Sequence, residues 1–113
     1  MLRVYGIKNC DTVKKALRWL DDHQQDYEFV DFKKKSPSSS ELKTWKKAYG
    51  DWPVNKKGRT FKTIKEDFEA ADEQGKVALM QEKTSAIKRP IVMSGNDVLT
   101  FGFSEEEFEE KLS

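Results

Sequence analysis

The stretch YGIKNCDTVKKAL, from Tyr5 to Leu17, contains Cys10, the only cysteine of the chain. The residues from Leu2 to Ile7 predict a short apolar strand, and the apolar residues after the cysteine recur at the spacing of a helix buried along one face: Val13, Ala16, Leu17 and Leu20. We therefore expect Cys10 at a helix N-terminus, where unpaired backbone N–H groups and the helix dipole stabilise a thiolate. The alternative is a buried cysteine that acts as a small apolar residue.

The composition narrows the class of protein. With 113 residues, the chain is long enough for a single domain over residues 1–113 and too short for two ordinary ones. Its 21 Lys and Arg residues nearly balance 20 Asp and Glu residues, so no excess positive charge favours nucleic acid or a membrane surface. No apolar run approaches the roughly 20 residues of a membrane span, and no leader is recognisable. A lone cysteine is typical of a reducing compartment, so we expect a cytoplasmic protein. We also expect a monomer that has no membrane partner and does not bind nucleic acid directly.

Alternation of strand and helix patterns predicts the architecture. The run from Tyr27 to Phe32 is a second strand, parallel to the first because a helix-length crossover separates them. A helical insertion follows at about residues 38–82, and its first helix starts at a capping box formed by Ser38 and Glu41.

The C-terminal part completes the pattern. Two short apolar runs, 91–93 and 98–101, flank a turn and predict an antiparallel hairpin. Ser104 with Glu107 predicts a capped final helix, with Phe103 and Phe108 as its hydrophobic staple. The order βαβ, helical insertion, ββα predicts an α/β protein with a mixed sheet and a thioredoxin-like fold.

Three segments resemble the arsenate reductase (ArsC) family: GIKNCDTVKKA at residues 6–16, NKKGRTF at residues 55–61 and IKRPIV at residues 87–92. The Cys-Asp-Thr start of the first segment is most similar to the YffB branch, whose members are regarded as glutathione-dependent thiol reductases. The resemblance implies a thiol oxidoreductase with Cys10 as its nucleophile. It implies no bound cofactor, and glutathione as the co-substrate that supplies the second thiol.

The resemblance also implies the other site residues. Arg89 matches an arginine that precedes the family's cis proline, here Pro90, and a guanidinium there can hold a carboxylate or an oxyanion beside the sulfur. The cysteine loop supplies three further candidate substrate-binding residues: Lys8, Asn9 and Thr12. We expect Lys8 and the helix N-terminus to lower the pKa of Cys10, and the charge of Asp11 to raise it.

Two departures from the family pattern bear on the substrate. Lys57 stands in register with a family arginine, whereas Arg59 lies two residues later, and the sequence leaves open which of them contacts substrate. The family's arsenate reductases have another arginine after the last strand, where this chain has residues 100–104, TFGFS. Arsenate reduction is therefore an alternative to, and less favoured than, reduction of a glutathione-containing or other thiol adduct.

A regulatory role is the second alternative. Spx proteins resemble this chain in fold and act by contacting RNA polymerase; those with a redox switch carry Cys-x-x-Cys, whose fourth position is Val13 here. Binding to RNA polymerase without a switch would use the helical insertion, where Trp45 and Tyr49 form either an interaction face or part of the core. The only histidine, His23, has no cysteine cluster beside it, and we expect no metal site.

Overall fold

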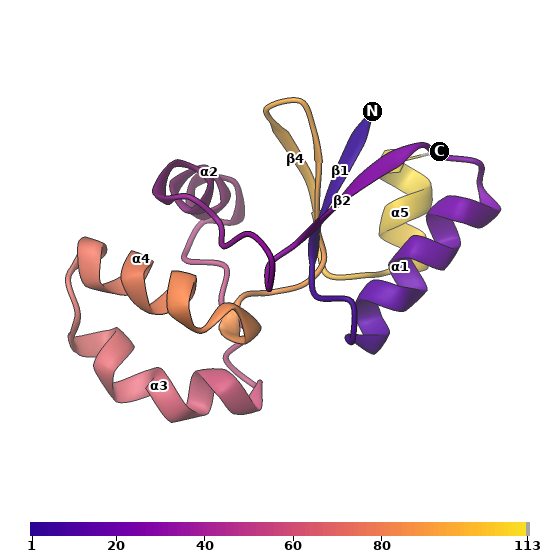
Figure 1. Ribbon diagram of the computed structural model, residues 1–113. Helices are drawn as coiled ribbons and strands as arrows, with labels where there is room; N and C mark the ends of the chain where they lie inside the picture. The colour runs from indigo at the N-terminus through magenta and orange to yellow at the C-terminus, as the bar shows by residue number, and fades with distance from the viewer. Residues whose placement is uncertain (113) are drawn as a thin grey trace. The chain divides into compact units, whose positions relative to one another are not determined.

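The computed structural model describes residues 1–112 and divides the chain into two compact units (Figure 1). Unit 1 comprises residues 1–35 and the part of the chain from Arg89 onward, and unit 2 comprises residues 36–88. Unit 1 contains a sheet and two helices: β1 (Leu2–Gly6), α1 (Asp11–Asp22), β2 (Tyr27–Asp31), β3 (Ile91–Ser94), β4 (Asp97–Phe101) and α5 (Glu105–Leu112). Unit 2 contains helices: α2 (Ser39–Tyr49), α3 (Arg59–Ala70), α4 (Glu73–Glu82) and the short 3₁₀ helix η1 (Thr84–Ala86).

The sheet of unit 1 has four strands in the order β2-β1-β3-β4. Strands β1 and β2 are parallel, and β3 is antiparallel to both β1 and β4. The crossover through α1 explains the parallel pair, and a tight turn around Gly95 joins the antiparallel hairpin. The predicted α/β class, mixed sheet and thioredoxin-like arrangement are confirmed.

Helices α1 and α5 pack on one face of this sheet (Figure 1). The side chains that form this core are apolar and come from both helices and the two central strands: Val4, Ala16, Trp19, Leu20, Val92, Phe108 and Leu112. Phe108 lies edge-on to Trp19 at a centroid distance of 5.3 Å and to Phe103 at 4.9 Å. The predicted staple of the last helix is thus present, and the buried aromatic surface anchors both helices.

Capping hydrogen bonds and a glycine mark where helices of unit 2 begin and end. The Ser38 hydroxyl accepts a hydrogen bond from the Glu41 backbone N–H at 3.0 Å, and the Glu41 carboxylate accepts one from Ser38 at 2.9 Å. This is the predicted capping box. Gly50 ends α2 with a φ of 92°, a left-handed conformation that favours glycine. Asp72 caps α4 by accepting a hydrogen bond from Gly75 at 2.8 Å.

The helices of residues 1–112 are short and carry many charges. None of them combines the length and the apolar composition needed to cross a membrane. Of the two aromatic side chains predicted on α2, Trp45 is fully buried, whereas Tyr49 is exposed.

Candidate thiol site

Cys10 lies between β1 and α1, immediately before the first residue of the helix. It is the N-cap residue of α1, with extended backbone angles (φ −112°, ψ 123°), and its carbonyl accepts the first helical hydrogen bond, from Lys14, at 2.9 Å. A Cβ atom on Gly6 would lie 2.9 Å from Val13 Cγ2, so a side chain at position 6 would press on the first turn of the helix. The Cys10 side chain itself is partly exposed.

The surroundings of the sulfur favour its ionised form. Burial raises the pKa of the Cys10 thiol, but hydrogen bonds from the backbone N–H of Val13, from Arg89 and from the backbone N–H of Thr12, together with the Arg89 charge, outweigh it. The net result is a pKa below the ordinary value. The helix N-terminus therefore acts as predicted, with Thr12 contributing its backbone group, while Lys8 and Asp11 are not among the causes of the shift.

The sheet register brings Arg89 to the cysteine. Strand β3 runs antiparallel to β1, and Ile91 pairs with Tyr5, so the residues just before β3 lie beside those just after β1. Pro90 follows Arg89 through a cis peptide bond, as the resemblance implies, and its carbonyl accepts a hydrogen bond from Gly102 at 2.8 Å. Pro90 is buried and Arg89 is half-buried. Arg89 is thus held between two strands while its guanidinium reaches the sulfur.

The other predicted site residues fall into two groups. Lys8 and Asn9 are exposed in the turn that precedes Cys10. Lys57 and Arg59 belong to unit 2, Lys57 in the loop before α3 and Arg59 as the first residue of that helix. Both side chains are exposed, and both belong to the unit that does not contain Cys10.

A shallow pocket of about 390 Å³ beside the cysteine loop was not predicted from the sequence. Lys8 lines it together with Lys34 and Lys35, which follow β2. Asp31 also lines it, and its carboxylate accepts a hydrogen bond from the Lys33 backbone N–H at 3.0 Å, which orders the lysine turn. The carboxyl ends of parallel neighbouring strands meet at one sheet edge, and this rule places the two basic turns together.

Comparison with known proteins shows the family to which the chain belongs. Residues 5–111 match the ArsC family. An uncharacterized protein of Haemophilus influenzae is 36% identical over 111 residues, which cover 96% of each chain. Among solved structures, a protein named YFFB is 35% identical with a TM-score of 0.88 and full coverage of both chains. An arsenate reductase from Vibrio cholerae has the same fold, with a TM-score of 0.80 at 22% identity over 98% of this chain and 97% of that one.

Proposed function

Because the chain belongs to the ArsC family, a family of thiol-based reductases, we propose that it is a glutathione-dependent thiol reductase with Cys10 as its single nucleophile. The observation that carries the proposal is the arrangement at the sulfur. The backbone groups of Val13 and Thr12 and the Arg89 side chain together lower the pKa of the Cys10 thiol and outweigh the effect of its burial. A thiolate present near neutral pH attacks disulfides far faster than a thiol does.

The first step is attack on a mixed disulfide between glutathione and a thiol substrate. The Cys10 thiolate attacks the glutathione sulfur, a new S–S bond forms between Cys10 and glutathione, and the substrate leaves as a thiolate that takes a proton from water. The substrate is reduced by two electrons, and Cys10 becomes oxidised within the new disulfide.

The second step needs a thiol from outside the chain, because the chain has one cysteine. The thiolate of a second glutathione attacks the glutathione sulfur of the mixed disulfide. Oxidised glutathione leaves, and Cys10 returns to the thiolate state. Since the pKa of Cys10 is lowered, it is a good leaving group in this step.

Charged groups around the cysteine suit the two carboxylates of glutathione. Arg89 pairs with one carboxylate beside the sulfur, where its planar guanidinium can donate two parallel hydrogen bonds. The pocket lined by Lys8, Lys34 and Lys35 receives the other, because its three lysines outnumber the carboxylates of Glu28 and Asp31. Asn9 and Thr12 flank the sulfur on either side in sequence and complete the set.

The alternative activities have less support from the described residues. The segment after β4, residues 102–104, contains no cation that could bind an arsenate oxyanion. Within unit 1, Arg89 is the arginine that acts on the Cys10 thiol. For RNA polymerase binding, the predicted face on α2 retains Tyr49 but loses Trp45, which is buried. Thiol-disulfide exchange with glutathione uses the residues that converge on Cys10.

A titration followed by NMR tests the proposal. Reduced and oxidised glutathione are added to ¹⁵N-labelled protein, and we expect amide shifts concentrated at Cys10, Val13 and Arg89, with a covalent adduct only from the oxidised form. The Cys10→Ser variant is the control, because it should keep the non-covalent shifts and lose the adduct. An absence of amide shifts around Cys10 and Arg89 would contradict the glutathione proposal.

A further inference from the structure

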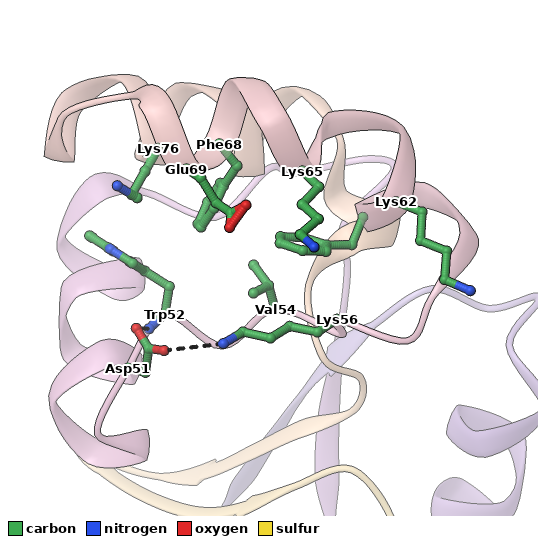
Figure 2. Close-up of a pocket in the computed structure, with 10 residues that line it drawn as sticks. Asp51, Trp52, Val54, Lys56, Lys62, Lys65, Phe68, Glu69 and Lys76 are labelled. Carbon is green, nitrogen blue, oxygen red and sulfur yellow. Dashed lines mark hydrogen bonds and ion pairs between the residues drawn. The ribbon is translucent and has the colours of Figure 1, made fainter.

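Unit 2 contains a second pocket, which the thiol chemistry of Cys10 does not use (Figure 2). It lies between helix α3 and the loop 51–56, with Lys76 of α4 at one end, and its volume is about 570 Å³. Pockets that bind small molecules typically measure about 300–1,000 Å³. We call it the α3 pocket.

The floor of the α3 pocket is apolar and largely aromatic. Four buried side chains form it: Trp52, Val54, Phe61 and Phe68. The Phe61 and Phe68 rings meet edge to face, with centroids 5.5 Å apart, so the floor is held by its own packing. A flat aromatic body placed on this floor would replace water against ring surfaces, which is favourable.

Most of the charged groups around the pocket already have partners. The Lys56 ammonium forms an ion pair with the Asp51 carboxylate at 3.7 Å, drawn as the dashed line in Figure 2. The Lys76 ammonium donates a hydrogen bond to the Ala71 carbonyl at 2.7 Å and lies over the Phe68 ring at 5.5 Å. Lys56 is thus paired with a carboxylate, and the contacts with Ala71 and Phe68 hold the Lys76 ammonium at one end of the pocket.

Two opposite charges remain inside the pocket. Lys65 and Glu69 extend from α3 toward the cavity in Figure 2, and Lys62 of the same helix also lines the pocket. Lys65 and Glu69 are both exposed, and among residues 1–112 neither side chain has a hydrogen bond or an ion pair. They are four residues apart in the order lysine then glutamate, which is the weaker order for pairing along a helix.

We propose that the α3 pocket binds a small zwitterion with an aromatic body, of the class of the aromatic amino acids. The ligand carboxylate pairs with Lys65, its ammonium group pairs with Glu69, and its ring lies on the floor formed by Trp52, Phe61 and Phe68. This complement uses the opposite charges of both α3 side chains at once, whereas a simple anion would leave the Glu69 carboxylate beside it.

Three probes with the same indole ring separate the contributions of charge. L-tryptophan has both charged groups, indole-3-propionate lacks the ammonium group, and tryptamine lacks the carboxylate. Each is titrated into the ¹⁵N-labelled full chain, and the dissociation constant is taken from amide shifts of residues lining the pocket. We expect L-tryptophan to bind about threefold to tenfold more tightly than either of the other two probes.

Charge-removing variants assign each contact. Lys65→Gln should weaken L-tryptophan and indole-3-propionate and leave tryptamine unchanged, whereas Glu69→Gln should weaken L-tryptophan and tryptamine and leave indole-3-propionate unchanged. Lys43→Gln, on α2 and outside the pocket lining, is the matched control and should change no affinity by more than about twofold. These lysines and Glu69 are exposed, so the variants should fold, and their amide spectra verify it.

Several results would overturn the proposal. Equal binding of the three probes would indicate unspecific apolar adsorption, and tightest binding of indole-3-propionate would indicate a site for simple anions. Shifts outside the pocket, or affinities unchanged by both Lys65→Gln and Glu69→Gln, would place the ligand elsewhere. Cys10→Ser should leave all three affinities unchanged, which separates this test from that of the thiol chemistry.

Discussion

The Arg89 side chain lowers the pKa of the Cys10 thiol, through a hydrogen bond and through its charge, although the two residues are far apart in the sequence. The antiparallel pairing of β1 with β3 makes this contact possible, because it aligns the end of one strand with the start of the other. The contact adds a full positive charge to the partial charges of the helix N-terminus. The pKa of Cys10 therefore depends on the pairing of β1 with β3 in the sheet.

Replacement of Arg89 by methionine should make Cys10 less reactive. The variant loses both the hydrogen bond and the charge that lower the pKa of the thiol, so a smaller fraction of Cys10 is ionised at pH 7. We expect the rate of alkylation by iodoacetamide at pH 7 to fall about threefold to tenfold. Arg18→Gln, an exposed change on α1, is the control; equal rates for Arg89→Met and the wild type would contradict the contact.

The lowered pKa of Cys10 also predicts how stability depends on pH. Because the pKa in the folded chain lies below its value in the unfolded chain, the thiolate stabilises the fold fully above the unfolded pKa. This contribution is lost as the pH falls through the folded pKa. In urea unfolding, the stability of the wild type relative to Cys10→Ser should therefore be greater at pH 9.5 than at pH 6, and a difference of the opposite sign would refute a lowered pKa.

Gly6 and Val13 should be energetically coupled. A Cβ at position 6 would lie 2.9 Å from Val13 Cγ2, and Val13 is fully buried. We expect Gly6→Ala to lower the free energy of unfolding by about 1–3 kcal/mol, as overpacked sites do. In a Val13→Ala background, where the clashing methyl groups are absent, the same substitution should cost less. A double-mutant cycle from urea unfolding measures this coupling, and additive effects would disprove the close contact.

Removal of the Ser38 side chain should destabilise the start of α2. Ser38→Ala deletes the hydroxyl that accepts a hydrogen bond from Glu41 at 3.0 Å, and loss of such a cap typically costs about 1 kcal/mol. Urea unfolding measures the change. Ser39→Ala is the matched control, because Ser39 is exposed and lies just inside the helix. Equal stability of the two variants would show that the cap contributes nothing.

Local chemistry made part of the fold predictable from sequence. The capping box at Ser38, the stop at Gly50 and the staple of Phe103 with Phe108 each depend on residues close together in the chain. The reactive position of Cys10 was predictable for the same reason, since a strand and a helix flank it directly.

Contacts between segments that are distant in sequence were harder to predict. The pairing of Arg89 with Cys10 followed from the family resemblance, because nothing local to IKRPIV indicates the register of β3 against β1. The α3 pocket could not be predicted, since aromatic residues such as Trp52, Phe61 and Phe68 are typical of an ordinary core until their placement around a cavity is known. The pocket beside Lys34 and Lys35 could not be predicted either, because a run of lysines is typical of a solvated turn.

Intact-mass measurement of single turnover tests the central claim most directly. Wild-type protein is mixed with a glutathionylated peptide, and reduced glutathione is added afterwards. We predict that one glutathione becomes attached to Cys10 as the peptide thiol is released, and that added glutathione then clears this adduct and yields oxidised glutathione. A protein that never acquires the adduct, or whose adduct yields to dithiothreitol but not to glutathione, would contradict a glutathione-dependent mechanism at Cys10.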